Sequence, residues 1–198
     1  MRFLALGDSY TIGESVAAAE RWPVQLARRM RDAGVNMENP TIIATTGWTT
    51  GELADGIARK GPQGPFGLVS LLIGVNNQYR GRDLSEYRAQ FVALLEQAIG
   101  FADGDPQRVL VLSIPDWGVT PFAANRHAER VSGEIDAFNA VNAEETARLG
   151  ARYVDITPIS RQALNDPALI AADGLHPSGK MYTAWTELVL PEALAAAE

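Results

Sequence analysis

Three residues of this chain have the types needed for nucleophilic catalysis. Ser9 follows a short apolar run, residues 3–6, and so lies on the turn that leaves a predicted buried strand. A serine hydroxyl is a weak nucleophile at neutral pH and needs a base to take its proton and an acid to orient that base. His176 and Asp173, three residues apart near the end of the chain, supply both groups. A Ser-His-Asp set is defined by geometry and roles, so their distance from Ser9 in sequence is no objection.

The tetrahedral intermediate that forms when a serine attacks also needs hydrogen-bond donors for its negatively charged oxygen. Loss of one such donor typically lowers the rate by about 10²–10³. We identify three candidate donors: the backbone N–H of Ser9, the backbone N–H of Gly47 and the side-chain amide of Asn76. A glycine at position 47 lets a substrate approach the main chain closely. Asn76 stands beside Asn77 in a predicted loop, from which its amide would project into a cleft.

Each of these residues also has an ordinary structural interpretation. Ser9 is a suitable cap for the first helix, and Asp173 with the glycine after it is a common turn. Gly47 can serve backbone geometry alone, Asn76 can belong to a turn, and His176 can simply precede the last helix. The occurrence of all five at the ends of predicted strands favours the catalytic interpretation.

The composition limits the classes of function. The chain has 198 residues, 46% of them hydrophobic, which is enough for one domain, residues 1–198, with a sizeable core. The absence of cysteine excludes disulfides, thiolate zinc sites and a cysteine nucleophile. His127, expected to be a solvated helix residue, and His176 are the only histidines, which argues against a metal site. The net charge of −7, without a basic face, argues against nucleic-acid binding.

The sequence contains no long apolar run of the kind that forms a leader or a membrane span. We therefore expect no stable membrane insertion and a cytoplasmic protein, although removal of a leader from this chain stays open. The sequence does not indicate an oligomeric state.

Short apolar runs alternate with segments of helical periodicity. The runs are continuous rather than alternating, which is typical of strands buried on both faces of a parallel sheet. The predicted strands are residues 2–6, 41–45, 68–73, 108–114 and 151–155. The predicted helices are residues 23–33, 51–60, 84–101, 125–149 and 178–197, the last broken or kinked at Pro191. This pattern predicts an α/β fold, a doubly wound three-layer sandwich with a five-stranded parallel sheet.

In such a fold, ligands bind beyond the carboxyl ends of the strands. The polar candidates above all follow predicted strands, so we expect them along one edge of the sheet. Tyr10, Trp48 and Trp117 follow strand ends too and are candidates for the wall of an apolar substrate pocket. Asp116 and Asp155 are rival acids, but neither has a histidine near it in sequence. Whether residues 118–125 form a lid is open.

At this point the chain resembles a known family. Four blocks match, in order, those of the SGNH hydrolases, also called GDSL-like lipases and esterases: Gly7-Asp8-Ser9, Gly47, Gly74-Val75-Asn76-Asn77 and Asp173-Gly174-Leu175-His176. The resemblance implies Ser9 as nucleophile, Gly47 and Asn76 as oxyanion donors, His176 as base and Asp173 as its partner. It also implies a flavodoxin-like fold and hydrolysis of a small-molecule ester without a cofactor or a metal.

The match has two departures. The third block of the family usually ends in aspartate and here ends in Asn77, which brings the rigidity of that loop into question. The first block lacks the leucine of the longer GDSL pattern. Short acyl esters are the default substrate, with thioesters, acetylated sugars and phospholipid acyl chains as alternatives. A non-catalytic flavodoxin-like binding module is the alternative outside the enzymes.

Overall fold

Five apolar segments form one parallel sheet within residues 1–124 and 126–198, the part of the chain that the computed structural model describes. The strands are β1 (Phe3–Gly7), β2 (Thr41–Ala44), β3 (Leu68–Leu72), β4 (Val109–Leu112) and β5 (Arg152–Val154). Their order across the sheet is β2-β1-β3-β4-β5, and every neighbouring pair is parallel. The predicted sheet is confirmed, with strand ends that differ by one or two residues from the prediction.

The three inner strands explain the continuous apolar runs of the sequence. Every residue of β1, β3 and β4 is buried, whereas the edge strands β2 and β5 are only partly covered. In the register of the sheet, Leu6 of β1 lies beside Ile43 of β2 on one side and Leu71 of β3 on the other. Helices cover both faces, so neither face of an inner strand needs a polar residue.

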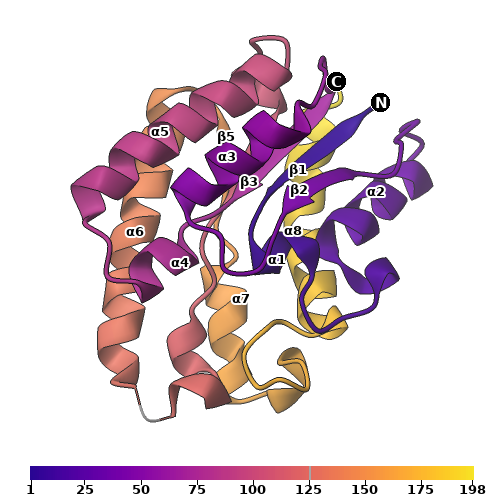
Figure 1. Ribbon diagram of the computed structural model, residues 1–198. Coiled ribbons are helices and arrows are strands. Elements are labelled where there is room, and N and C mark those ends of the chain that lie inside the picture. The colour runs from indigo at the N-terminus through magenta and orange to yellow at the C-terminus, as the bar shows by residue number, and fades with distance from the viewer. Residues whose placement is uncertain (125) are drawn as a thin grey trace.

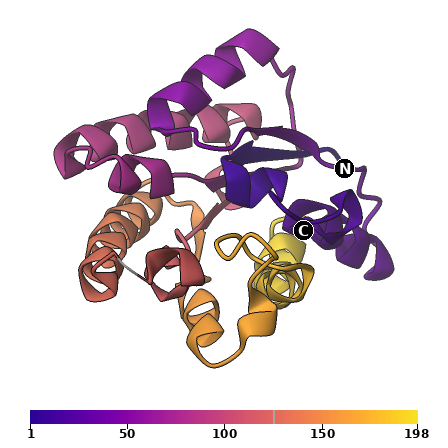
Figure 2. The same ribbon diagram turned by 60° about the horizontal axis from the view of Figure 1, so that its bottom comes forward.

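The long helices form the two outer layers of the sandwich (Figures 1 and 2). One face carries α3 (Thr50–Lys60), α5 (Leu84–Phe101) and α6 (Ala128–Arg148), and the other carries α2 (Trp22–Asp32) and α8 (Gly179–Ala195). This division follows from right-handed crossovers in a sheet whose strand order reverses beside β1. Trp22 and Trp185 are fully buried in the layer of α2 and α8.

The helix bounds agree with the prediction at α5 and differ elsewhere. Asn125 lies outside the described residues, and it belongs both to the predicted helix 125–149 and to segment 118–125, whose role as a lid is open. The described part of α6 begins at Ala128. Helix α8 continues through Pro191 to Ala195, so the proline does not break it. Pro191 lies on the exposed side of α8, while Val189 and Ala193 pack into the core and hold the helix in place.

Three short helices at the carboxyl ends of strands were not predicted, because four or five residues are too few to show a helical period. They are α1 (Ser9–Ile12) after β1, α4 (Val75–Tyr79) after β3 and α7 (Thr157–Arg161) after β5. Figure 2 brings this edge of the sheet forward, with α1 near its middle. The residues predicted to take part in the chemistry therefore lie at the carboxyl edge of the sheet, where ligands bind in folds of this kind.

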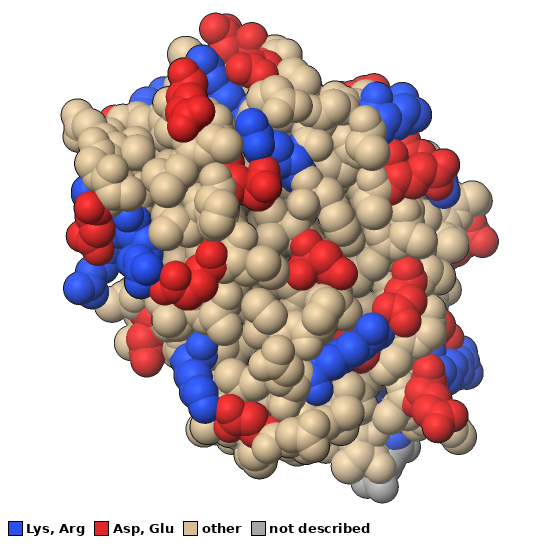
Figure 3. All heavy atoms as spheres, turned by 180° about the vertical axis from the view of Figure 1, so that it is seen from behind, with Lys and Arg blue, Asp and Glu red and all other residues tan. Residues whose placement is uncertain are grey.

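The surface seen in Figure 3 mixes acidic and basic side chains without a continuous basic patch on that face. None of the described helices is long and apolar enough to cross a membrane.

Candidate active site

Ser9 is the first residue of α1 and is almost completely buried. The first N–H groups of a helix have no acceptor within the helix, so the backbone N–H of Ser9 is suited to bind an anionic oxygen. The cap of α1 is Asp8, whose Oδ1 accepts a hydrogen bond from the Tyr10 N–H at 3.0 Å. The alternative in which Ser9 caps this helix is therefore wrong. The hydroxyl of Ser9 is not used as the helix cap.

Asp8 has an unusual environment. Its side chain is fully buried, and among the described residues its Oδ2 has no hydrogen-bond partner. Burial raises the pKa of Asp8 to about 7, against the lowering effect of the hydrogen bond from the backbone of Tyr10. The cap of the helix that begins at Ser9 is thus a carboxyl group with a pKa near neutral pH.

The imidazole of His176 and the carboxylate of Asp173 are in hydrogen-bond contact, as the predicted roles of base and acid require. The distance from His176 Nδ1 to Asp173 Oδ2 is 2.6 Å. The tight turn between them also points the N–H groups of Leu175 and His176 at Asp173 Oδ1, at 2.9 and 3.0 Å. Tyr10 packs its ring edge against the imidazole, with 5.7 Å between ring centroids. The pair is held by hydrogen bonds on one side and by an aromatic contact on the other.

Ser15 supplies a further hydrogen bond to this aspartate. Its Oγ donates to Asp173 Oδ2 at 2.6 Å across a sequence separation of 158 residues. Partial burial raises the pKa of Asp173, but the hydrogen bonds from Ser15, His176 and the two backbone N–H groups outweigh it and hold that pKa well below its usual range. At neutral pH the ionised Asp173 accepts the proton on Nδ1 of His176, which leaves Nε2 as the ring nitrogen that can take a proton.

Ser9 and His176 line the same cleft, which has a volume of about 200 Å³ and also contains Gly47 and Asn76. The structure therefore brings four of the five predicted catalytic and oxyanion residues to one cavity, and Asp173 stands directly behind His176. The described residues show no hydrogen bond between Ser9 Oγ and the imidazole. Such bonds are often long in a free enzyme and tighten when substrate binds.

Asn76 lies on α4 and not in a loop, contrary to the prediction. Helix α4 begins after Gly74, whose φ of +131° suits glycine alone. Because a glycine at this place favours a turn, the sequence does not indicate the helix. The side-chain Nδ2 of Asn76 donates to the carbonyl oxygen of Trp48 at 2.9 Å. One N–H of the amide is thereby fixed, and the second is free to point into the cleft.

Gly47 has a φ of +86° in the loop after β2. Its carbonyl oxygen accepts a hydrogen bond from Arg80 Nη2 at 2.6 Å, and the other end of the same guanidinium pairs with Glu52 at 3.2 Å. Asn76 and Arg80 are four residues apart at the two ends of α4 and hold the consecutive carbonyls of Gly47 and Trp48. Sequence reasoning missed Arg80, since nothing in its own neighbourhood indicates this contact.

Asn77, which replaces the aspartate usual in the third family block, is firmly held in the structure. It is buried, and its Oδ1 accepts from the Thr50 N–H at 3.0 Å while its Nδ2 donates to Thr50 Oγ1 at 2.8 Å. Both ends of the amide are therefore used to fasten α4 to the first residue of α3. The neutral amide of Asn77 therefore fixes this segment without the charge of an aspartate.

Two of the three aromatic residues expected in a substrate pocket lie in the cleft. Tyr10 and Trp117 line it, and so do Tyr79 and Phe122, which sequence reasoning missed. Trp48 is not among the residues of this cleft. Its indole lies over Gly56 of α3, where a Cβ would come within 2.2 Å of the ring, so the missing side chain of the glycine makes room for it.

The rival acids are engaged elsewhere. Asp116 forms an ion pair with Arg161 at 2.9 Å, and Asp155 accepts a hydrogen bond from Ser113 at 2.9 Å. Asp173 is thus the carboxylate in contact with His176. Within the described ranges, no group of three or more histidine, aspartate and glutamate side chains is arranged to hold a metal ion.

Comparison with known proteins gives one family and a consistent fold. The profile of the GDSL-like Lipase/Acylhydrolase family matches residues 5–184, which include every candidate site residue. No curated protein matches the sequence significantly. Among solved structures, the chain is similar to TesA, with a TM-score of 0.73 and 20% identity over 99% of both chains.

Two further structures show the same similarity. For the lipase/acylhydrolase from Enterococcus faecalis, the TM-score is 0.70 and the identity 22%, over 97% of this chain and 95% of that chain. For a mutant of Axe2, an acetyl-xylooligosaccharide esterase from Geobacillus, they are 0.69 and 18%, over 97% and 93%. At such identities the likeness shows the fold, and it confirms the predicted three-layer sandwich.

Proposed function

Because the chain belongs to the GDSL-like lipase/acylhydrolase family and is a serine hydrolase of the SGNH type, we propose that it hydrolyses carboxylic esters with short acyl chains through a Ser9-His176-Asp173 triad. The observation that supports the proposal is that His176 lies in the wall of the cleft that contains Ser9 and is hydrogen-bonded to Asp173 behind it. Family membership sets aside the non-catalytic binding module.

In the first half of the proposed reaction, Ser9 Oγ attacks the ester carbonyl carbon and its proton passes to Nε2 of His176. The ionised Asp173 stabilises the imidazolium that forms. The carbonyl oxygen becomes an oxyanion, which receives hydrogen bonds from the N–H groups of Ser9 and Gly47 and from the amide of Asn76. The intermediate then collapses: the C–O bond to the alcohol breaks, and the imidazolium gives its proton to the departing oxygen.

The second half returns the enzyme to its starting state. Water attacks the acyl-Ser9 carbonyl and gives a proton to His176, and the second intermediate releases a carboxylic acid as Ser9 Oγ recovers its proton. No electron donor or acceptor takes part. Apart from the ester and one water molecule, the steps use only Ser9, His176, Asp173 and the oxyanion donors.

The size of the cleft supports a short acyl chain. Pockets for drug-sized ligands are usually about 300–1,000 Å³, whereas this cleft measures about 200 Å³. Its apolar walls, formed by side chains such as Val75, Trp117 and Leu175, suit an acetyl or butyryl group. The structural likeness to an acetyl-xylooligosaccharide esterase makes acetylated sugars a second class to test, and thioesters a third.

Labelling with a fluorophosphonate probe tests the role of Ser9 directly. We expect wild-type protein to be labelled and Ser9→Ala to be neither labelled nor active on 4-nitrophenyl acetate. Ser85→Ala, an exposed serine on α5, serves as the matched control and should behave like wild type. Labelling of Ser9→Ala, or its full activity, would show that another residue is the nucleophile.

A substrate panel tests the acyl preference separately. We expect kcat/KM to fall as the acyl group grows from acetyl to octanoyl, because the longer chain does not fit the cleft. An acetylated xylooligosaccharide and an acyl thioester complete the panel. A maximum at octanoyl would contradict the assignment to short acyl chains and leave the role of Ser9 intact.

A further inference from the structure

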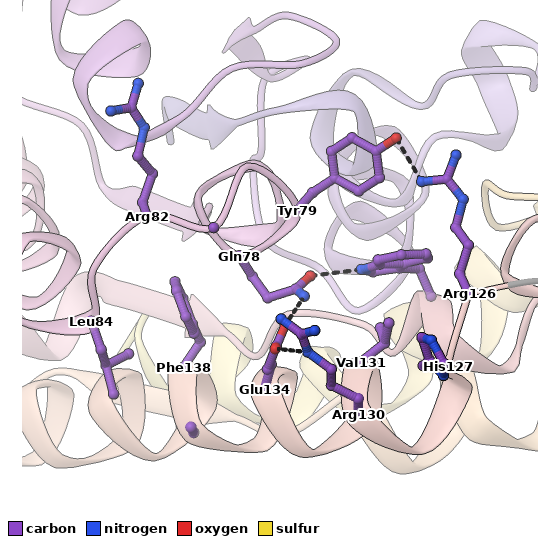
Figure 4. A pocket seen from close by; sticks show the side chains of 13 residues that line it. Gln78, Tyr79, Arg82, Leu84, Arg126, His127, Arg130, Val131, Glu134 and Phe138 are labelled. Atoms are coloured by element: carbon purple, nitrogen blue, oxygen red, sulfur yellow. Dashed lines mark hydrogen bonds and ion pairs between the residues drawn. The ribbon is translucent and has the colours of Figure 1, made fainter.

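A second hollow adjoins the proposed catalytic cleft. It is a broad groove of about 860 Å³ between α4 and the first half of α6, and its residues are drawn in Figure 4. Tyr79 and Trp117 line both the groove and the cleft, so the two hollows share a wall. A substrate too large for the cleft has a place for its remainder directly beyond these two rings.

The groove is positively charged in a chain whose net charge is −7. Three arginines line it, Arg82, Arg126 and Arg130, against one carboxylate, Glu134. Glu134 is ionised, since hydrogen bonds from Arg130 and Gln78 lower its pKa. It is matched by Arg130, with 2.7 Å between Nε and Oε1. The charges of Arg82 and Arg126 remain, which gives the groove an excess of two positive charges.

Of the three arginines in the groove, Arg126 contacts two aromatic residues that also line the cleft of Ser9. Its guanidinium lies over the ring of Phe122, 4.5 Å from the centroid, and 5.4 Å from the centroid of Tyr79. It donates from Nη1 to the Tyr79 hydroxyl at 2.8 Å, as Figure 4 shows. Both rings line the cleft of Ser9, so this cation stands at the rim of that cleft.

This arrangement leaves Arg126 able to bind an anion. A guanidinium has five N–H donors in one plane, and stacking on aromatic rings occupies its faces while its edges stay accessible. Among the described residues only Tyr79 takes a hydrogen bond from its side chain. Carboxylate and phosphate groups match the edge of a guanidinium and form the strongest hydrogen bonds with it.

Resting on the proposed function, we propose that this groove binds a negatively charged group, carboxylate or phosphate, on the alcohol portion of the ester, with Arg126 as its principal contact. The alcohol portion is assigned here because the cleft of about 200 Å³ takes the short acyl group. The rings of Tyr79 and Trp117 pack against each other, with 5.5 Å between centroids, and close the shared wall. The remainder of the ester therefore extends over the rim of the cleft, where Arg126 lies on the rings of Tyr79 and Phe122. Arg82 also lines the groove and lies on the side of Tyr79 away from Arg126 in Figure 4. Its positive charge adds to the electrostatic attraction of the anionic group.

The test compares two phenyl acetates that differ in charge on the leaving group. We would measure kcat/KM for 4-acetoxybenzoate, which is anionic, and for its neutral methyl ester, with 4-acetoxyphenyl phosphate as the second anion. The anionic-to-neutral ratio should fall about fivefold in Arg126→Gln and largely survive in Arg126→Lys, which keeps the charge. Arg59→Gln, an exposed arginine at the end of α3, controls for net charge and should leave the ratio unchanged. The difference between wild type and Arg126→Gln should shrink in about 1 M NaCl.

Three outcomes overturn the proposal. The first is an equal ratio in wild type and Arg126→Gln while both still hydrolyse the neutral ester. The second is an equal fall in Arg59→Gln, which would assign the preference to net charge. The third is a preference for an anion on the acyl side, measured with mono-4-nitrophenyl adipate against 4-nitrophenyl hexanoate. If no ester is hydrolysed by wild type, the proposed function itself has failed, which the neutral ester reveals without reference to the groove.

Discussion

The guanidinium of Arg80 holds the carbonyl oxygen of Gly47 at 2.6 Å. Arg80 is the residue that ends α4, the helix that carries Asn76, and it is itself fixed by Glu52. Glu52 in turn accepts from the Thr49 N–H at 2.8 Å as part of the capping box of α3. The conformation of the proposed oxyanion glycine is thus tied to two helices through one arginine.

We expect Arg80→Ala to lower kcat for 4-nitrophenyl acetate about tenfold with little change in KM. The loss should be smaller than the 10²–10³ seen when an oxyanion donor is removed, because the Gly47 N–H is displaced and not deleted. Addition of guanidinium ion should restore part of the rate, which a general loss of stability would not allow. Arg59→Ala is the matched control; a kcat for Arg80→Ala within twofold of wild type would refute the clamp.

Ser15 offers a separate test of the acid in the triad. In Ser15→Ala, Asp173 loses a donor, and its pKa moves back toward the ordinary value. Because the native pKa is depressed, the stabilisation is complete above the unfolded-state pKa near 4 and is lost as the pH falls through the much lower pKa of the folded state. We expect the variant to lose about 1 kcal/mol of unfolding free energy at neutral pH, a hydrogen bond to a charged group reduced for solvent exposure.

The measurement is urea denaturation of wild type and Ser15→Ala at about pH 7 and about pH 3. The difference between the two proteins should persist at the lower pH, because the pKa of Asp173 lies well below its usual range and both folded proteins still hold an ionised Asp173 there. Ser15→Gly is a useful companion, because Ser15 has a φ of +65° that glycine adopts without strain. A difference that vanishes at about pH 3 would show that the pKa of Asp173 is not held so low.

The raised pKa of Asp8 predicts a pH dependence of the unfolding free energy with the opposite sign to that of Asp173. Its pKa of about 7 in the folded protein lies above the ordinary value of 3.8, so the folded state holds a proton that the unfolded state has released. Stability from this group is complete below about pH 4 and is lost as the pH rises toward 7 and beyond. Asp8→Asn keeps an oxygen to accept from the Tyr10 N–H and does not titrate.

We therefore expect the unfolding free energy of Asp8→Asn, relative to wild type, to increase between about pH 4 and pH 8. A shift of about three pKa units corresponds to at most about 4 kcal/mol. Other titrating groups are common to both proteins and cancel in the difference. A flat difference across this range would mean that the buried carboxyl group has an ordinary pKa.

Part of this site could be predicted because it obeys rules that act locally. Ser9, Gly47 and Asn76 each follow a strand of a parallel sheet, and the strand-end rule places them together without knowledge of any contact. Asp173 comes only after α7, and its tight turn with His176 places it. The family blocks then distinguish them from ordinary turn residues. The sheet itself was predictable for the same kind of reason, since continuous apolar runs have few other uses in a chain of this composition.

The residues that support the site could not be predicted in this way. Ser15 meets Asp173 across 158 residues, and Arg80 meets Gly47 across 33, so neither contact leaves a sign in the neighbouring sequence. Helix α4 was missed because a glycine and two asparagines favour a turn. The prediction for Trp48 did not consider that a glycine on the next helix would make room for its ring.

Gly74 and Gly81, which flank α4, give the last prediction. Both have positive φ values, +131° and +63°. A Cβ on Gly74 would lie 2.5 Å from the Tyr87 hydroxyl oxygen and 2.7 Å from Ile114 Cδ1, whereas a Cβ on Gly81 would meet nothing within 4 Å. Gly81→Ala therefore carries only backbone strain, about 1 kcal/mol, and Gly74→Ala adds a clash inside the core.

The Tyr87 hydroxyl has no room to retreat, because it is buried and hydrogen-bonded to Asn142 Oδ1 at 2.6 Å. We expect Gly74→Ala to lose about 3 kcal/mol or more of unfolding free energy, as overpacked core variants do, and Gly81→Ala about 1 kcal/mol. Because α4 starts at Gly74, the first variant should also lose esterase activity under conditions where it remains folded, since Asn76 and Arg80 move with the helix. Equal stability of the two variants in urea denaturation would contradict this explanation of why the chain has glycine at position 74.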